Sequence, residues 1–345
     1  MRPMRLHPAL LCLLAAWSLL LLIGGCSGSH AALDPASPQN TSIKNLFWLF
    51  FWVAVAVQVL VTLALLPAWL RRHRTIDPPP IDPEEHNTKA TFIISILVLI
   101  TTITLAVLLL GDFFTGRATH AAWYDPEPLK IKITGRQWWW EVQYTNDPEP
   151  YKSVTTANEI HLPLGKTIEF DLESADVIHS FWVPNLHGKK DMIPGHPTTL
   201  RVRPDREGTF FGQCAEFCGE QHAKMRLMVI VEAEDKFNAW LEAANRPAPE
   251  PVFENQKRGK EVFLTSSCVM CHTINGTTAG SRVGPNLTHV AGRQMIAAAS
   301  VYNNRGNLAG WVLDPHKFKP GVRMPQNALD PTQLRDLLDY LEMLK

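Results

Sequence analysis

Two long uncharged apolar stretches lie near the start of the chain. Residues 46–70 and 92–111 contain no charged side chain over 25 and 20 positions. Either length is enough for an α-helix to cross about 30 Å of hydrocarbon. A shorter apolar run, residues 9–23, follows a basic start, which is typical of a secretory signal. We therefore expect a signal peptide over residues 1–25 and two transmembrane helices.

Basic residues are distributed unevenly around the two predicted helices. The connecting segment, residues 71–91, carries four Lys and Arg residues, whereas residues 26–45 contain only Lys44. After the second helix, the stretch before residue 129 contains only Arg117. Because Lys and Arg are enriched in cytoplasmic loops, residues 71–91 are expected inside the cell and both flanking parts outside.

Beyond residue 112, apolar and polar positions alternate with a period of two. The β-rich segments are residues 129–134, 167–172, 200–203 and 225–231. Turn residues such as Pro163-Leu-Gly165 separate them. Short strands at this spacing predict an antiparallel sandwich or barrel over residues 112–243.

The last part of the chain follows a proline-rich segment. Residues 244–251 predict a semi-rigid linker, and residues 252–345 suit a small all-α domain. Its closing segment, residues 331–344, has helical spacing and should pack on the first helix of that domain. The predicted architecture is a multidomain membrane protein: two transmembrane helices, an all-β domain and an all-α domain.

Composition narrows the function classes. The 345 residues include 33 Lys+Arg and 33 Asp+Glu, and this balance argues against a nucleic-acid partner. The charge is nevertheless sorted: residues 112–246 hold 15 basic and 20 acidic side chains, and residues 252–345 hold 11 and 7. Opposite charge on two tethered domains should favour their docking.

A dense set of soft donors follows the β-rich region. Cys214, Cys218, His222 and Met225 fall within one short segment, and His179 lies upstream. Two thiolates, two imidazoles and a thioether favour copper, and the second cysteine exceeds what a mononuclear blue-copper site needs. A closed zinc site and a Cys214–Cys218 disulfide are the alternatives.

The all-α domain contains the sequence Cys268-Val-Met-Cys271-His272. Cys-x-x-Cys-His is the attachment pattern of c-type haem, with His272 as the axial ligand. A redox Cys-x-x-Cys or half of a zinc site are the alternatives. Met324 is the preferred sixth ligand because Gly321 and Pro325 hold it in a loop. The other candidates are Met295 in an Ala-rich helical run, Met343, His289 and His316.

The spacing Cys-x-Glu-x-Cys-Gly-x-x-His-x-x-Met resembles the binuclear copper loop of subunit II of haem–copper cytochrome c oxidases. The motifs at 135–140, 179–184 and 191–195 fit the same family in order. The resemblance implies a cupredoxin fold with Cys214 and Cys218 as bridging thiolates. It adds His179, His222, Met225 and the backbone carbonyl of Glu216 as the remaining copper ligands.

The resemblance also implies roles at the edge of the copper centre. Trp138 matches an exposed tryptophan through which electrons enter. The side chain of Glu216 would reach a magnesium ion at the interface with subunit I. One departure concerns the segment before the second helix, where the family often has a carboxylate at a proton entrance and this chain reads His86-Asn-Thr-Lys-Ala-Thr-Phe92.

Residues 284–287 and the loop around Met324 resemble class I cytochromes c. A subunit II fused to a cytochrome c is the arrangement of caa-type oxidases. This implies the electron-input subunit of a proton-pumping oxidase, with a reduced cytochrome or another donor on one side. On the other side the partners would be subunit I and subunit III. The alternatives are a subunit of a copper-containing nitric-oxide reductase and a stand-alone membrane-tethered electron carrier.

Cys26 completes the predicted sites. It follows Ile23-Gly24-Gly25 at the end of the signal, which resembles a bacterial lipoprotein cleavage box. Cys26 would then carry a lipid, and both redox domains would face the outer side of the bacterial inner membrane.

Overall fold

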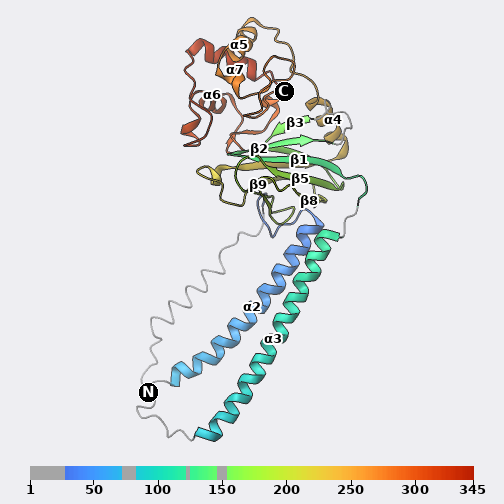
Figure 1. Cartoon of the computed structure of the whole chain (residues 1–345), viewed down its shortest axis with the longest axis vertical. Coiled ribbons are helices and arrows are strands. Elements are labelled where there is room, and N and C mark those ends of the chain that lie inside the picture. The colour runs from blue at the N-terminus through green and yellow to red at the C-terminus, as the bar shows by residue number, and fades with distance from the viewer. Residues whose placement is uncertain (1–27, 72–82, 122–124, 146–153) are drawn as a thin grey trace, which may run out of the picture.

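A computed structural model describes residues 28–71, 83–121, 125–145 and 154–345. The predicted signal peptide, Cys26 and most of the loop between the two membrane helices lie outside these residues. A pair of long helices extends from a β-sandwich, and a helical domain sits on the opposite side of the sandwich (Figure 1).

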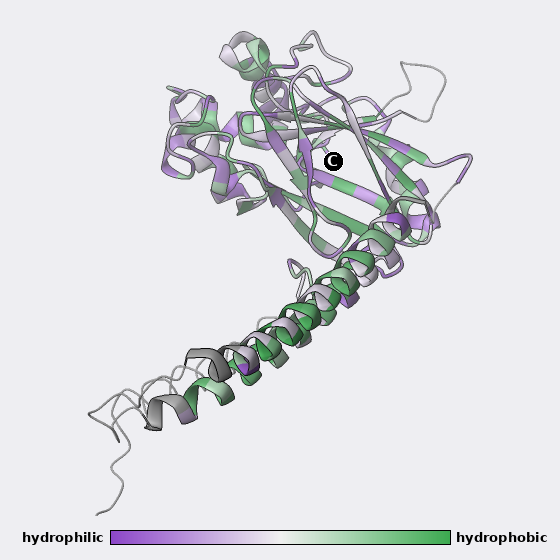
Figure 2. Cartoon of the chain, turned by 60° about the horizontal axis from the view of Figure 1, so that its bottom comes forward, coloured by the Kyte–Doolittle hydropathy of each residue, from purple (hydrophilic) through white to green (hydrophobic). Residues whose placement is uncertain are grey.

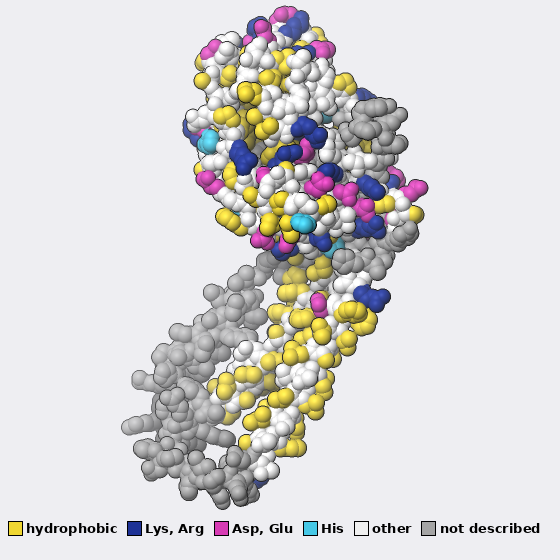
Figure 3. All heavy atoms as spheres, viewed as in Figure 1, with side chains coloured by type: hydrophobic (Ala, Val, Ile, Leu, Met, Phe, Trp, Pro, Cys, Tyr) yellow, Lys and Arg dark blue, Asp and Glu magenta, His cyan; other side chains and the backbone are white. Residues whose placement is uncertain are grey.

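The two apolar stretches form the helices α2 (Pro38–Arg71) and α3 (Pro83–Ala121). Both are longer than predicted, because polar turns continue each helix beyond its apolar run. Ser37 caps α2 by accepting a hydrogen bond from the Asn40 amide at 3.0 Å. Residues 38–67 and 88–119 are long and apolar enough to span a membrane. Apolar residues run along both helices (Figures 2 and 3).

The segment just before α2 is fastened to the sandwich. The Asn185 side-chain amide donates to the carbonyls of Gly28 and Asp34, at 2.9 and 2.8 Å. Arg206 pairs with the Asp34 carboxylate at 2.9 Å, and this hydrogen bond lowers the pKa of Asp34. The N-terminal end of α2 is therefore fixed to the β-sandwich.

Two five-stranded sheets make up the sandwich. The first sheet has the order β3 (Val154–Ala157), β2 (Trp139–Tyr144), β1 (Leu129–Arg136), β5 (Ile168–Ser174) and β8 (Thr198–Val202). The second has the order β4 (Glu159–Pro163), β10 (Arg226–Glu232), β9 (Gly208–Cys214), β6 (His179–Trp182) and β7 (Lys190–Met192).

The antiparallel pairing expected from the sequence is wrong for two of the strand pairs. β1 pairs with β5 in parallel, and β4 pairs with β10 in parallel, while the other pairs are antiparallel. The chain crosses from β3 to β4 in the second sheet and then returns, so β5 meets β1 running the same way. The predicted alternation is nevertheless confirmed, because Ile131, Ile133, Phe170 and Leu172 are at most 1% exposed. With α4 (Glu234–Ala244), these strands form what we call the β-domain.

The C-terminal domain has its own core, built where α5 (Glu254–Thr265) crosses α7 (Pro331–Leu341). The helices approach so closely that a Cβ at Gly259 would lie 1.9 Å from the Asp336 carbonyl oxygen. The remaining elements are η3 (Ser267–Met270), η4 (Val290–Gly292), β11 (Met295–Ile296), β12 (Val301–Tyr302), α6 (Arg305–Leu313) and η5 (Pro315–Lys317). The packing of the closing helix on the first helix is confirmed.

The predicted helical run around Met295 is wrong. Met295 lies on β11, which pairs with β12. Ala297, Ala298 and Ala299 then adopt left-handed backbone angles, with φ of 56°, 57° and 51°. Alanine favours helices, but the chain must reverse here to pair the two short strands.

Candidate functional site

Six predicted donors converge at one end of the sandwich. His179 begins β6, Cys214 ends β9, and the others lie on the loop that leads through η2 (His222–Lys224) to β10. The two Sγ atoms lie 3.7 Å apart, too far for a disulfide bond of about 2.05 Å. The remaining neighbours of the sulfurs are the His179 and His222 Nδ1 atoms, the Glu216 carbonyl oxygen and the Met225 Sδ atom.

Each sulfur has its own imidazole. Cys214 Sγ lies 3.8 Å from His179 Nδ1 and 3.1 Å from the Glu216 carbonyl oxygen. Cys218 Sγ lies 3.7 Å from the Nδ1 of His222, and 3.8 Å from the sulfur of Met225. This near-symmetrical set, called the donor cluster below, could hold a soft metal such as copper.

Backbone and carboxylate contacts fix the His179 ring. Gly135 on β1 faces it so closely that a Cβ there would lie 2.8 Å from the ring. The Asp176 carboxylate binds Nε2 at 2.8 Å, which turns Nδ1 toward the sulfurs. Burial would lower the pKa of His179, but hydrogen bonds with Asp176 and Cys214 outweigh it and raise the pKa.

The two thiols are close enough to share a proton. The hydrogen bond between the two thiols is the main cause that lowers the pKa of Cys214 and raises the pKa of Cys218. A ready thiolate beside two imidazoles and a thioether fits a soft metal such as copper.

The predicted haem residues line a large cavity of about 660 Å³. Cys268 and Cys271 lie on and just after η3, and His272 follows them. Met324 lies on another part of the same wall. The cavity is closed on one side by residues of the β-domain, among them Gln137, Trp138 and Asp176. We call it the large cavity.

His272 is held ready to bind a metal. Its Nδ1 lies 2.7 Å from the Pro285 carbonyl oxygen and donates to it, so the Nε2 lone pair is free. Burial lowers the pKa of His272 and keeps the ring neutral. A Cβ at Gly284 would lie 2.8 Å from the ring, so the residue behind His272 must be small.

A buried arginine also supports haem in the large cavity. Arg293 lines it, and its Nε is buried without a hydrogen-bond partner among the described residues. Burial lowers the pKa of Arg293 to about 10, so the group remains charged at neutral pH. Its Nη2 donates to the neutral Asn286 carbonyl, so the guanidinium still has an unused N–H that fits a carboxylate of a haem.

The structure excludes some of the candidates for the sixth ligand of the haem iron and keeps others. Both ring nitrogens of His289 meet backbone carbonyls, at 2.8 and 3.0 Å, which leaves none for iron. Met343 packs against the helical core. Met295 lines the large cavity together with Met324, so geometry leaves both methionines in reach.

Trp138 connects the two sites, but it is not exposed as the resemblance implies. It is only 9% exposed because the C-terminal domain covers it. Its Nε1 donates to the Cys218 carbonyl at 3.0 Å, and Gln137 donates to the same oxygen at 2.7 Å. The tryptophan therefore bridges the wall of the large cavity and the donor cluster.

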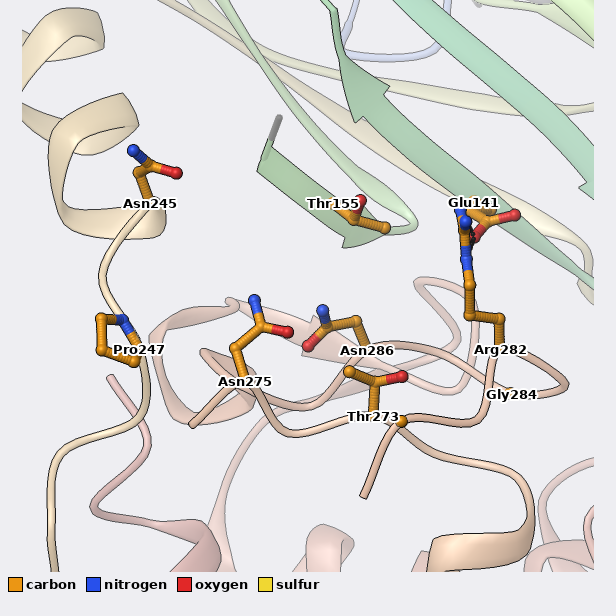
Figure 4. Close-up of a pocket in the computed structure, with 10 residues that line it drawn as sticks. Glu141, Thr155, Asn245, Pro247, Thr273, Asn275, Arg282, Gly284 and Asn286 are labelled. Atoms are coloured by element: carbon orange, nitrogen blue, oxygen red, sulfur yellow. Dashed lines mark hydrogen bonds and ion pairs between the residues drawn. The ribbon is translucent and has the colours of Figure 1, made fainter. Parts of the chain in front are cut away.

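Charged contacts and a second cavity mark the edge of the domain interface. Arg282 of the C-terminal domain reaches the buried Glu141 on β2 at 2.9 Å, and Arg136 pairs with the other carboxylate oxygen at 3.0 Å. Figure 4 shows this contact beside a polar cavity of about 420 Å³, lined by both domains.

Several residues around the sites were missed from sequence. Asp176 stands three positions before His179, a spacing that could have suggested its role. Arg293, and the interface residues Lys319 and Arg323, gave no local signal, because only the folded arrangement brings them to the large cavity.

Comparison with known proteins gives a consistent result. The profile of the cytochrome c oxidase subunit II periplasmic domain matches residues 147–233, and the cytochrome c profile matches residues 256–345. Cytochrome c oxidase subunit 2 of Alkalihalophilus pseudofirmus is 33% identical over 336 residues, which is 95% of each chain. That of Bacillus sp. (strain PS3) is 29% identical, over 73% of this chain and 72% of its own.

A solved structure is also similar to part of the chain. The periplasmic domain of subunit II of cytochrome oxidase from Bradyrhizobium japonicum is 32% identical, with a TM-score of 0.32, and the match covers 34% of this chain and 92% of that one. The β-domain is cupredoxin-like and the C-terminal domain is a cytochrome c domain, so the predicted fold class is confirmed. With a relative matched over nearly its whole length, the chain belongs to the cytochrome c oxidase subunit II family.

Proposed function

We propose that this chain is the electron-input subunit of a proton-pumping terminal oxidase, and that it holds two redox centres between an external donor and subunit I. The donor cluster would hold two copper ions through His179, Cys214, the Glu216 carbonyl, Cys218, His222 and Met225. Covalent haem c would be held by Cys268, Cys271, His272 and Met324. When bound, these groups supply the one-electron chemistry that amino-acid side chains lack.

The observation that carries this proposal is the position of Trp138. It lines the large cavity and donates a hydrogen bond to the Cys218 carbonyl at 3.0 Å. A single side chain thus spans the interval between the two predicted centres. We assign Trp138 as the entry point to the copper centre, reached from within the chain and not directly from solvent.

The surrounding residues orient the ligands and exclude water. Asp176 aims the Nδ1 of His179 at the sulfurs, and the Pro285 carbonyl aims the Nε2 of His272 into the large cavity. His179 and Met225 are 0% exposed. A dry, fixed ligand set changes little when an electron arrives, which favours rapid transfer.

Copper is favoured over a closed zinc site by the number of donors. Four ligands would satisfy zinc, yet Met225 Sδ also lies 3.8 Å from Cys218 Sγ, and the Glu216 carbonyl lies 3.1 Å from Cys214 Sγ. A binuclear centre uses all six donors.

Membrane placement and partners complete the proposal. The two helices would cross the bacterial inner membrane, with the N-terminus and both redox domains outside and subunits I and III as neighbours. Lipid on Cys26 is consistent with this topology. The Glu216 side chain is 44% exposed and pairs with Lys189 at 3.4 Å. In the complex, that side chain would turn to a magnesium ion at the subunit I interface.

The test is a metal, haem and substrate assay of the complex purified from its native host. We expect two coppers and one covalent haem per chain, a near-infrared copper band, and oxygen consumption. One zinc and no copper would overturn the assignment of the donor cluster. Nitric-oxide consumption without oxygen consumption would favour the reductase. A chain that purifies with no haem-bearing partner would contradict the oxidase assignment.

A further inference from the structure

The loop that holds the donor cluster and the loop that leads to Met324 are joined by hydrogen bonds. Gln221 donates its side-chain amide to the Pro320 carbonyl, and Lys224 donates to the Phe318 carbonyl at 2.5 Å. Both donors lie within the Cys214–Met225 segment, beside the predicted copper ligands. The residue between the two acceptors is Lys319.

Lys319 also joins the two domains, but here the donor belongs to the C-terminal domain and an acceptor belongs to the β-domain. Its Nζ donates to the carbonyl of Trp138 at 3.2 Å and to that of Ala297 at 3.4 Å. It therefore ties together the Met324 loop, the bridging tryptophan and the left-handed alanine turn that lines the large cavity. Arg323 adds a second contact, with its guanidinium 6.0 Å from the centre of a Trp138 ring and a hydrogen bond to Gln137.

The burial of Lys319 is costly, which makes an incidental contact a poor explanation. The residue is 1% exposed, although lysine is almost never fully buried without a partner of opposite charge. Both of its hydrogen-bond acceptors are neutral carbonyls. Burial is the main cause that lowers its pKa to about 7.

The close fit continues next to Lys319. A Cβ at Gly321 would lie 2.0 Å from a carboxylate oxygen of Glu220, and the Gly321 φ of +76° also favours glycine. The two loops therefore touch along residues 220–224 and 318–321.

We infer that Lys319 is a positioning residue, whose buried Nζ fixes the Met324 loop against Trp138 and the donor cluster and so sets the haem-to-copper distance. This rests on the proposed function, since it assumes a redox group on each side of Trp138. Lys319 touches neither redox group; it acts through the Trp138 carbonyl and the alanine turn.

The decisive variant is Lys319→Met, which keeps the aliphatic stem and removes the ammonium. Lys317→Met is the matched control, because the Lys317 side chain is 79% exposed and pairs with Asp314 of its own domain. In the intact complex we expect Lys319→Met to slow haem-to-copper transfer after flash reduction roughly tenfold, the effect of losing one buried hydrogen bond. Copper and haem absorption should stay at wild-type values.

A second readout does not depend on electron transfer. Amide hydrogen exchange should rise around residues 137–138, 297–299 and 318–321 in Lys319→Met and not in Lys317→Met. Unchanged exchange and transfer would overturn the inference, as would equal slowing in both variants. Loss of the haem or copper spectrum in Lys319→Met would make Lys319 a folding residue and overturn it as well.

Lys224→Met supplies an independent check from the other domain. Its side chain is exposed, so folding should tolerate the change, and exchange at the amides of Phe318 and Lys319 should rise in the same way. An unchanged exchange pattern would contradict a joined interface. Absence of copper from the wild-type complex would instead refute the proposed function, so the two failures are distinguishable.

Discussion

The donor cluster and the large cavity solve the problem of holding a redox group in opposite ways. In the donor cluster, the ligands already touch: the sulfurs lie 3.7 Å apart, and each has an imidazole within 3.8 Å. The large cavity is a space of about 660 Å³ whose walls come from loops and short helices. In the donor cluster the fold itself brings the ligands into contact, whereas in the large cavity the predicted ligands lie on different parts of the wall.

The difference follows from what surrounds each site. The donor cluster lies at the end of a sandwich with one continuous core, which includes residues from every part of the β-domain between Leu129 and Phe237. The core of the C-terminal domain is smaller and borders the large cavity, because Ile296, Leu308, Val312 and Leu341 belong to both. Metal loading should therefore add little to the folding of the β-domain, whereas haem should complete the core of the C-terminal domain.

The largest expected effect tests this comparison by removing each group in turn. Cys268→Ser with Cys271→Ser should abolish covalent haem and remove the cooperative unfolding of the C-terminal domain. Cys214→Ser with Cys218→Ser should abolish copper and leave the unfolding transition of the β-domain in place. Calorimetry of the purified chain, with haem and copper analysis, measures both. Equal loss of structure in the two double variants would contradict the comparison.

The next effect concerns the sixth ligand of the haem iron. Met324 and Met295 both line the large cavity, so either could provide it. Met324→Leu should change the haem spectrum and lower the reduction potential, because thioether ligation raises it. Met295→Leu is the matched control and should change neither, since leucine preserves most of the packing volume. A redox titration of the two variants decides the assignment. If Met295→Leu changed the spectrum and the potential and Met324→Leu did not, the sixth ligand would be Met295 on β11.

The sequence alone predicts the ligands of the two sites but not the residues that lie between them. The donors and the Cys-x-x-Cys-His motif were recognisable because metal ligation demands particular residue types at short spacing, and the structure brings the copper donors together. The burial of Trp138 was not recognisable, because it depends on a domain more than 100 residues away in sequence. The same holds for Lys319, which reads locally as a surface lysine.

The strand pairing and the alanine turn were missed for a related reason. Alternation reports which face a residue occupies and not which strand lies beside it, so the parallel β1–β5 pair was invisible. Helix propensity favours a helix through Ala297–Ala299, but the β11–β12 reversal and the Lys319 contact override it.

A smaller effect is expected from substituting the glycines that pack against His179 and His272. A Cβ at Gly135 or at Gly284 would lie 2.8 Å from the ring of His179 or His272, respectively. Gly135 sits inside β1 between two paired strands, so the backbone cannot move away. We expect Gly135→Ala to lower stability by about 1–3 kcal/mol and to distort the copper spectrum.

The matched change, Gly284→Ala, should be milder. Gly284 lies in a bend outside the helices and strands, and its loop can shift by a few tenths of an ångström. The haem spectrum should therefore change less than the copper spectrum does in Gly135→Ala. Absorption spectra and thermal unfolding of both variants measure this. A larger effect at Gly284 would show that the loop around His272 is as rigid as the sheet.

The smallest expected effect concerns the charged edge of the domain interface. Arg282 is 59% exposed, and the Glu141 carboxylate that it contacts keeps Arg136 at 3.0 Å when Arg282 is removed. Arg282→Met should therefore weaken docking by only about 0.5–1 kcal/mol, because the Arg282 guanidinium is largely solvated and Glu141 stays paired with Arg136. Measuring haem-to-copper transfer in this variant across a range of salt concentrations separates the contribution of the Arg282–Glu141 ion pair from that of the buried Lys319 contacts. A loss as large as that in Lys319→Met would mean that surface charge, and not the buried lysine, holds the two domains together.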